Sequence, residues 1–302
     1  MKFRKNILAL SVTTALIGLT ACGVTPQDEG TGEAAKKASG LAVDGYLAGA
    51  TVYADTNENN KLDAWEPRAL TDADGYFSYN PLANNGAGLN YCESDKNEDQ
   101  LHCLSAPIGY DEVMLRISGG YDLTTMEKFS GTLSMKLNVN GNVITTPQMA
   151  SPLTAILAHL TDEQKADLLT AEGLDASDVE QDFLDFTDTS DATVEAKRLS
   201  LMNLALKAHK VADMISGRIN LKFDQDVLAG NAPTEVKGLF GNTTGVSNDG
   251  SDLVYQAIAA QITSGVGLTA VLGDVTLMST IVDDSWDNFV AVVDEHNARL
   301  LA

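Results

Sequence analysis

The spacing of apolar residues changes near Pro147, and this change limits the folds open to the 302-residue chain. Before Pro147, short β-prone runs such as 50–54 and 76–79 are separated by turn residues, as in a series of strands. After Pro147, apolar residues recur with the 3.6-residue period of a helix. We therefore expect an α+β protein, with strands in the N-terminal half and a mainly α-helical domain over 146–302.

Helix start signals divide the C-terminal half into several helices. Capping boxes at 161–164 and 177–180 each open a helix. A longer helix is expected from about 193 to 219, ended by Gly217 or by the polar turn beyond it. The apolar stripes of these helices are expected to form a core, not a cofactor site. Three more helices are expected over 252–262, 274–282 and 285–301.

The N-terminus has the three parts of a secretory signal peptide. Residues 1–21 begin with basic side chains, continue with an apolar run over 7–19 and end in small residues before Cys22. The ending Leu-Thr-Ala-Cys resembles the lipobox of bacterial lipoproteins, which implies that Cys22 carries acyl chains such as palmitate. An ordinary signal peptide followed by a chance cysteine is the alternative. Because Gly23 rather than Asp follows the cysteine, the resemblance implies a lipid anchor in the outer membrane, on either face.

The charge of the chain excludes one class of partner. It carries 42 acidic and 20 basic residues, a net charge of −22. Nucleic-acid binding needs a concentrated basic surface, so no nucleic-acid partner is expected. Contact with a membrane is expected through the lipid anchor alone. Residues 22–40 are rich in small and polar side chains and are expected to form a flexible tether.

Two cysteines remain once Cys22 is assigned to the lipid. Cys92 and Cys103 bracket a polar stretch, and an exported protein is exposed to oxidising conditions. We expect them to form a disulfide, which would stabilise the fold by roughly 3 kcal/mol. A pair of free thiols, or metal ligands together with His102, are the alternatives.

A twelve-residue segment over 55–66 has the ligand spacing of a calcium loop. A loop that curls around a hard cation points every other side chain inward, and oxygen-bearing side chains alternate here in this way. Asn60 replaces the usual glycine at position 6, and Asn tolerates a positive φ. An Asn- and Asp-rich turn without metal is the alternative. The expected ligands are Asp55, Asn57, Asn59, the backbone carbonyl of Lys61, Asp63 and Glu66.

β-prone residues flank this loop, so it is expected to pin two strands together, unlike a helix–loop–helix sensor. Around it, segments 43–53, 66–67 and 71–77 contain the runs Val-Asp-Gly-Tyr-Leu-Ala-Gly-Ala and Asp-Ala-Asp-Gly-Tyr-Phe. This pattern resembles a prealbumin-like repeat, also called B-type or carboxypeptidase-regulatory-like, of bacterial surface proteins and adhesins. The resemblance implies an antiparallel β-sandwich over 41–145 that binds calcium in its acidic loop, with Asp72 as a further candidate ligand.

The sequence contains no recognisable catalytic motif. Its four histidines are scattered, and it has no Gly-x-Ser-x-Gly, Walker or dinucleotide-binding pattern. Carboxylates are plentiful, but nothing in the linear sequence selects a catalytic pair. The first hypothesis is a non-catalytic, lipid-anchored envelope protein that binds a surface protein or glycan in adhesion or envelope assembly. The alternatives are an enzyme or enzyme accessory acting on extracellular polysaccharide or peptide, and an envelope component that uses calcium only for stability.

Overall fold

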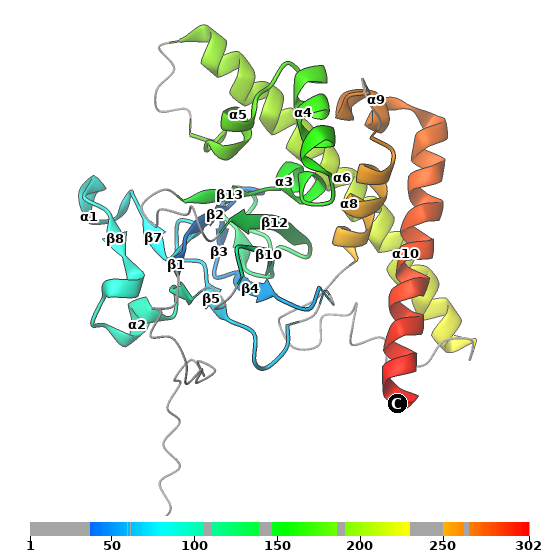
Figure 1. Ribbon diagram of the computed structural model, residues 1–302, viewed down its shortest axis with the longest axis horizontal. Helices are drawn as coiled ribbons and strands as arrows, with labels where there is room; N and C mark the ends of the chain where they lie inside the picture. Colours follow the sequence, from blue (N-terminus) through cyan, green and yellow to red (C-terminus); the bar gives the residue numbers. More distant parts are fainter. Residues whose placement is uncertain are drawn as a thin grey trace, which may run out of the picture. The chain divides into compact units, whose positions relative to one another are not determined.

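The structure is a computed structural model in which helices and sheets are combined (Figure 1). Helices hold 47% of the residues and strands 20%, which confirms the α+β class. The signal peptide, Cys22, most of the expected tether and the expected domain boundary at 145/146 lie outside the described residues. The structure describes residues 37–58, 60, 62–105, 110–138, 147–185, 191–229, 250–262 and 266–301.

A four-stranded antiparallel sheet carries the candidate site. Arg116, near the middle of β10, lies opposite Tyr53 on one neighbour and Ser134 on the other. The loop over 55–66 connects β4 to the edge strand β5, as expected from its β-prone flanks. In sheet order the strands are β12 (Thr132–Asn138), β10 (Glu112–Ser118), β4 (Thr51–Asp55) and β5 (Arg68–Leu70).

A second sheet has three strands, and one of its pairings is parallel. β13 (Gln148–Ala150) runs parallel to β2 (Gly40–Ala42), and β2 runs antiparallel to β6 (Tyr76–Phe77). The expectation of antiparallel pairing throughout is therefore wrong at β13. This strand lies in the half of the chain that was expected to be helical, and its tertiary partner is more than 100 residues away in sequence. Local patterning does not reveal such a pairing.

Short paired strands complete the β-structure. Lys37–Ala38 pairs with β9, so the last residues of the expected tether are part of the β-structure. Short helical segments interrupt the stretch between β7 and β9: α1 (Ala83–Gly86), a 3₁₀ turn (Tyr91–Glu93) and α2 (Asn97–Gln100). The strand pairs are β1 (Lys37–Ala38) with β9 (Leu104–Ser105), β3 (Leu47–Ala48) with β11 (Tyr121–Asp122), and β7 (Tyr79–Asn80) with β8 (Leu89–Asn90).

Alternation along the strands divides the four-stranded sheet into an apolar face and a polar face. On β10, Val113, Leu115 and Ile117 contribute to a buried apolar cluster that we call the sheet core. Met114 and Arg116 point the opposite way, and Arg116 is only 4% exposed. The sheet core consists of Ala38, Ala42, Leu47, Ala50, Val52, Ala54, Ala69, Phe77, Leu104, Val113, Leu115, Ile117, Phe129, Leu133, Met135, Leu137 and Ala150.

The C-terminal helices pack around a second core and differ in several places from the sequence expectation. Helices α3 and α9 lie where no helix was expected. The long helix continues past Gly217, and one helix replaces the two expected over 274–282 and 285–301. The second capping box is formed by Asp175 with Asp178, not by residues 177–180. The helices are α3 (Pro152–Leu157), α4 (Asp162–Ala171), α5 (Ala176–Glu180), α6 (Ala192–Leu228), α8 (Ser251–Ala260), α9 (Leu268–Gly273) and α10 (Val275–Leu301).

Helices α3 and α8 contact strand β12 and bring the helices onto the sheet (Figure 1). The buried apolar residues over 153–289 form what we call the helical core, which also includes Leu41, Val43, Tyr76 and Met149 from the β-structure. All described residues fall in one compact unit. Among the described helices, none is both long and apolar enough to span a membrane.

Candidate functional site

The loop over 55–66 has a buried carboxylate at each end. Asp55 is the last residue of β4 and is 1% exposed, while Glu66, just before β5, is 3% exposed. Asn60 has a φ of 59°, the left-handed conformation required at position 6 of the loop. Asn adopts this conformation more readily than other non-glycine residues, which accounts for the absence of glycine here. Two of the six expected ligands, Asn59 and Lys61, lie outside the described residues.

The described carboxylates of the loop accept hydrogen bonds from within the loop. Asp55 Oδ2 accepts from the backbone amide of Asn60 at 3.0 Å. Glu66 accepts from the amides of Thr56 at 3.0 Å and Asp63 at 2.9 Å. The Asn57 amide group donates to Asp63 Oδ2 at 3.0 Å, so four of the expected ligands lie on one hydrogen-bonded loop.

The chemistry of this donor set fits a hard cation, although the described side chains are not arranged around one. No three Asp, Glu, His or Cys side chains of the described residues form a metal-binding group. All the expected donors are oxygens, which calcium prefers. Burial raises the pKa of Glu66, the amides of Asp63 and Thr56 oppose the rise, and the nearby charges of Asp55 and Asp63 add to it, which indicates that the three carboxylates lie close together. Among the described residues, the hydroxyl oxygen of Thr56 is buried without a hydrogen-bond partner, an observation that the sequence pattern did not anticipate.

A buried ion-pair network extends from the loop to the helices, and sequence reasoning missed it. Arg116 Nε lies 2.9 Å from Asp55 Oδ2, and Arg116 Nη1 lies 2.5 Å from Asp252 Oδ2. Asp252 Oδ1 accepts a hydrogen bond from the Ser134 hydroxyl and lies 3.2 Å from Nε2 of His159. The only sign of it in the sequence was Arg116, an arginine at a polar position of a strand. Its partners Asp55 and Asp252 are far away in the sequence, so only the tertiary structure reveals the pairing.

The charges in this network keep one another ionised. Burial acts to raise the pKa of Asp252, but the charges of Arg116 and His159 outweigh it and hold that pKa well below its usual range. Burial likewise acts to lower the pKa of Arg116, and Asp252 and Asp55 more than offset it. Removing one partner of such a buried pair leaves an uncompensated charge and is strongly destabilising.

The network is not arranged as a nucleophilic triad. In such a triad the histidine lies between the serine and the acid and takes the proton of the serine. Here Asp252 lies between Ser134 and His159, and the Ser134 hydroxyl donates to the carboxylate. Ser134 also accepts a hydrogen bond from Arg116 at 2.9 Å, which does not activate a hydroxyl as a nucleophile. The arrangement supports the interface between sheet and helices.

A second acid–histidine pair joins the turn after β2 to helix α6. Asp44 Oδ2 lies 3.5 Å from Nε2 of His209, and the His209 ring stacks on Phe129. Asp122 and Asp213 are close enough for their charges to act on Asp44. Two pockets are described next, and neither is lined by Asp44 or His209.

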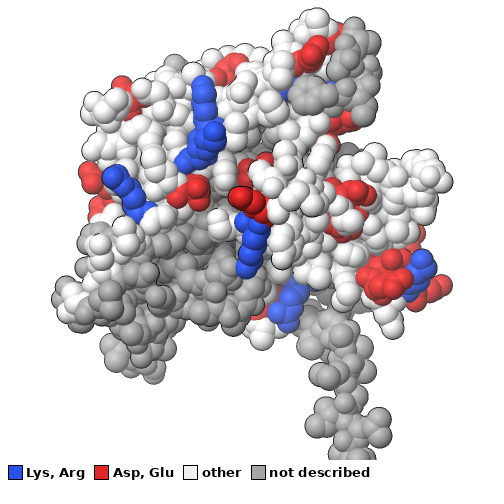
Figure 2. Space-filling view, turned by 180° about the vertical axis from the view of Figure 1, so that it is seen from behind, with Lys and Arg blue, Asp and Glu red and all other residues white. Residues whose placement is uncertain are grey.

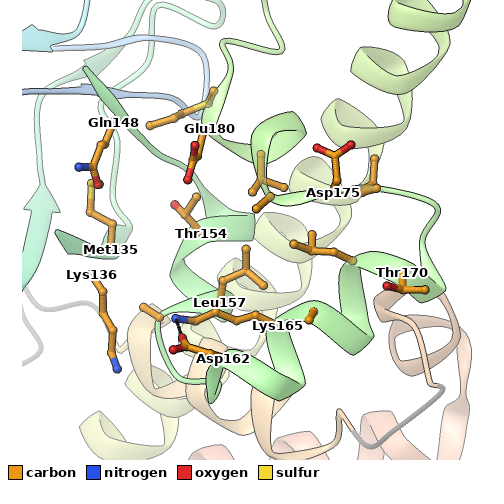
Figure 3. A pocket seen from close by; sticks show the side chains of 17 residues that line it. Met135, Lys136, Gln148, Thr154, Leu157, Asp162, Lys165, Thr170, Asp175 and Glu180 are labelled. Carbon is orange, nitrogen blue, oxygen red and sulfur yellow. Dashed lines mark hydrogen bonds and ion pairs between the residues drawn. The ribbon is translucent and has the colours of Figure 1, made fainter. Parts of the chain in front are cut away.

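The larger of these pockets is a groove of about 490 Å³ between β12, β13 and helices α3, α4 and α5 (Figure 3). This volume lies within the range of small-molecule sites. Its floor is mostly apolar, with Met135, Leu157 and Leu169 among the lining residues. Lys165 lies at its edge and is paired with Asp162 at 3.1 Å (Figure 3). The lining residues do not include a nucleophile paired with a base. Their chemistry does not point to a particular class of ligand.

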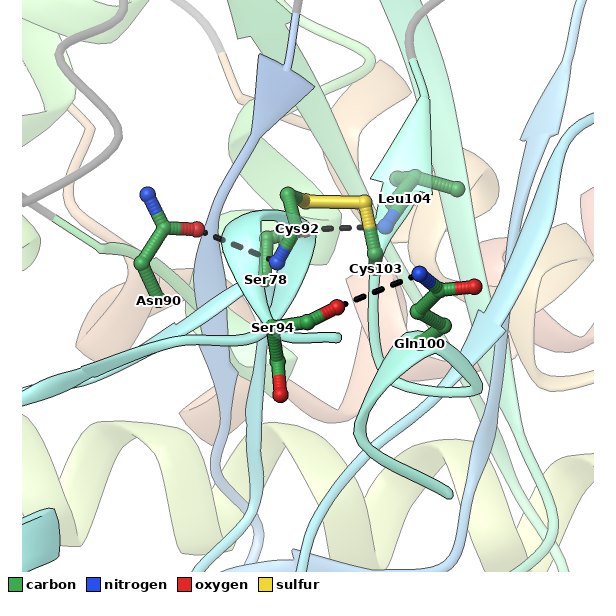
Figure 4. The surroundings of a disulfide bond; sticks show 7 residues. All are labelled: Ser78, Asn90, Cys92, Ser94, Gln100, Cys103 and Leu104. Carbon is green, nitrogen blue, oxygen red and sulfur yellow. Dashed lines mark hydrogen bonds between the residues drawn. A yellow bond between two sulfur atoms is a disulfide. The ribbon is translucent and has the colours of Figure 1, made fainter. Parts of the chain in front are cut away.

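Cys92 and Cys103 lie at disulfide distance, with their sulfur atoms 2.08 Å apart (Figure 4). Asn90 accepts a hydrogen bond from the amide of Cys92. Ser78 accepts one from the amide of Leu104 on the other side of the bond (Figure 4). The bond therefore closes the polar 92–103 segment against the β-structure, and the two cysteines are not arranged with His102 as metal ligands.

The charged side chains visible on one face of the molecule are dispersed. On the face shown in Figure 2, Lys and Arg side chains stand singly among Asp and Glu side chains. That face therefore offers no concentrated basic surface of the kind that phosphate binding needs.

Comparisons with protein-family models, with curated proteins and with solved structures find no match to the chain. The resemblance to prealbumin-like repeats therefore rests on the residues of the 43–77 region alone. The fold and ligand that it implies stay predictions, and function has to be argued from the site itself.

Proposed function

We propose that the protein is a lipid-anchored, non-catalytic component of the cell envelope that presents a binding surface on a calcium-stabilised β-sandwich. Lipidation at Cys22 and attachment to the outer membrane are part of this proposal and derive from the N-terminal sequence. The calcium ligands would be Asp55, Asn57, Asn59, Asp63 and Glu66, with the backbone carbonyl of Lys61.

The sheet core supports the sandwich. It takes Val52, Leu115 and Leu133 from the four-stranded sheet and Ala42 and Phe77 from the three-stranded sheet. Side chains that enter one apolar cluster from two sheets are what a sandwich requires.

The observation that carries the calcium proposal is the loop that connects β4 to β5. Its terminal carboxylates, Asp55 and Glu66, are buried in a strongly acidic chain, and the buried Thr56 hydroxyl oxygen beside them has no hydrogen-bond partner among the described residues. Buried carboxylates are costly unless a positive charge or hydrogen bonds compensate them. Arg116 pairs with Asp55, and backbone amides donate to both carboxylates. A bound cation would add to this compensation and hold the two strands at a fixed spacing. The ion would then act as a structural element and not as a catalyst.

An exposed aromatic side chain favours a binding role for this end of the sheet. Trp65 belongs to the same loop and is 55% exposed. Leu70 on the edge strand and Leu101 are also exposed, and they are adjacent because the Leu70 amide donates to the Leu101 carbonyl. Exposed aromatic and apolar groups beside a fixed loop suit a protein or glycan partner. The partner class in this proposal is therefore a surface protein or glycan.

Terbium, which replaces calcium and is excited by nearby tryptophan, tests the site. We expect terbium luminescence sensitised by Trp65, displaced by calcium, and lost in Asp63→Ala. This variant removes a proposed ligand without removing a partner of Arg116. Asp95→Ala, an exposed acid of the disulfide segment, is the matched control and should bind the ion normally.

The same variants connect the site to stability and to partner binding. With calcium tenfold above its dissociation constant, the native state gains about 1.4 kcal/mol, a rise in melting temperature of about 3 °C. Asp63→Ala should lose this rise and bind isolated cell envelopes less well, while Asp95→Ala keeps both properties. Identical melting curves and envelope binding with calcium and with chelator would contradict the proposed function.

A further inference from the structure

The turn over 43–46, which follows β2, contacts the helical half of the chain at two points. Asp44 Oδ2 lies 3.5 Å from Nε2 of His209 on α6, and the His209 ring stacks on Phe129. The Tyr46 hydroxyl donates a hydrogen bond to Asp182 Oδ2 at 2.7 Å, in the segment after α5. The turn is therefore held against the helices by one acid–histidine pair and one hydrogen bond.

The backbone of this turn is strained at Tyr46, whose φ is 57°. A bulky side chain rarely adopts this left-handed conformation, and it persists only where surrounding contacts hold it. On its other side the turn is bonded to the β-structure, because the Leu123 amide donates to the Gly45 carbonyl at 3.0 Å and to the Tyr46 carbonyl at 3.1 Å. Loss of the helix contacts would let Tyr46 relax, which gives the turn a second, released conformation.

The charged groups that face Asp44 come from two elements: His209 and Asp213 from α6, and Asp122 from β11. The Asp44 side chain is 9% exposed. Burial raises the pKa of Asp44 to about 6, while His209 opposes the rise and Asp122 and Asp213 add to it. In water the carboxyl would return to its ordinary pKa of 3.8. The docked turn therefore binds a proton at Asp44 more tightly than the released turn does.

We propose that the turn over 43–46 is a proton-sensitive clasp, docked on α6 in acid and released more often as the pH approaches neutrality. Between the two pKa values of Asp44, the docked turn keeps its proton while the released turn loses it. The ratio of docked to released turn therefore falls with rising pH, by at most about tenfold for each pH unit. The clasp involves neither the 55–66 loop nor a bound ion, so it holds or fails independently of the proposed function.

Native-state hydrogen exchange on the purified protein tests the clasp, with protection factors compared because intrinsic exchange also depends on pH. From about pH 4.5 to about pH 6.5, protection of peptides covering 41–48 and 121–129 should fall about tenfold or more. A local release exposes little surface, so this fall should be the same with and without a low concentration of urea. Peptides covering 112–118 in β10 exchange through larger openings, and urea should lower their protection.

Two substitutions should move the end of this fall in opposite directions along the pH axis. His209→Gln removes the charge that opposes the rise in the pKa of Asp44, so the fall should continue to a higher pH than in wild type. Asp213→Asn removes a repelling charge from an exposed position on α6, so the fall should end at a lower pH. A purely structural contact would lose protection equally at every pH. Shifts in the same direction would overturn the clasp.

Asp44→Asn and Tyr46→Phe separate the proton from the second contact. Asp44→Asn should give protection of 41–48 that no longer varies with pH. Tyr46→Phe removes the hydrogen bond to Asp182 and should lower protection at every pH while keeping the fall. Asp287→Asn, an exposed acid on α10, is the matched control and should behave as wild type.

Two results would overturn the clasp. One is a wild-type fall in Asp44→Asn, because another group would then carry the titration. The other is equal urea dependence of 41–48 and 112–118, because Asp44 would then titrate only when the whole fold opens. The second result is obtained with the wild-type chain, so it does not depend on a variant that folds poorly.

Discussion

At the scale of single residues, the most informative side chains are acids that the fold places in apolar surroundings. Asp44, in the turn after β2, is partly buried and faces His209 of helix α6. Burial raises its pKa from an ordinary 3.8 to about 6, Asp122 and Asp213 add to the rise, and His209 opposes it. Between these two pH values the folded state binds more protons than the unfolded state. The free energy of unfolding therefore falls as pH rises from about 4 to about 6.

Asp44→Asn is expected to remove this pH dependence. A difference of about two pKa units corresponds to about 3 kcal/mol, so the variant should gain up to that amount relative to wild type between pH 4 and pH 7.5. Urea denaturation at the two pH values gives the comparison, and other titrating groups cancel because they are common to both proteins. Asp287→Asn, an exposed acid, is the control and should show no such gain. A parallel pH profile for Asp44→Asn and wild type would contradict the assignment.

At the scale of elements, local signals marked where helices begin better than where they end. The Thr161 and Gln164 capping box forms at the start of α4 as expected. Helix α6 instead runs through Gly217 to Leu228, because packing of its apolar face in the helical core outweighs the unfavourable propensity of one glycine. Residues expected as two helices form the continuous α10, since no proline or strong cap separates them.

Gly217→Ala is expected to stabilise the protein by about 0.5–1 kcal/mol, because alanine has less freedom to lose in a helix. A Cβ at this exposed position meets no atom within 4 Å. Gly120→Ala is the opposite control: its φ is +78°, and a Cβ there would lie 2.6 Å from the carbonyl oxygen of Ala48. Chemical denaturation should show a gain for the first and a loss of more than 1 kcal/mol for the second. A destabilised Gly217→Ala variant would mean that this turn of α6 is not helical.

At the scale of the whole molecule, the two halves of the chain share their buried surfaces. Strand β13 comes after the β-rich half yet pairs with β2 near its start, and Leu41, Val43 and Tyr76 belong to the helical core. The Arg116 network crosses the same interface. The β-structure is therefore completed by residues from the helical half.

We expect the described part of the chain to unfold in one cooperative transition. Shared core residues and buried ion pairs make separate melting of the sheets costly, since it would leave Arg116 and Asp252 without compensation. Scanning calorimetry should give one peak with equal calorimetric and van't Hoff enthalpies. Addition of calcium should move this peak as a whole. Two resolved peaks, with only one sensitive to calcium, would show that the sheets and the helices unfold independently.

The sequence by itself determined the α+β class, the position of the acidic loop between two strands, the pairing partner proposed for Cys92 and the start of α4. These features depend on periodicity, turn residues and spacing over a few residues, which are local properties. The tertiary structure alone decided the parallel pairing of β13, the length of α6 and the link from Asp55 through Arg116 to Asp252. Each of these depends on packing or charge compensation between residues far apart in the chain. Burial then determines which of the many acids interact strongly with other charged groups, because water weakens the electrostatic interaction between exposed charges.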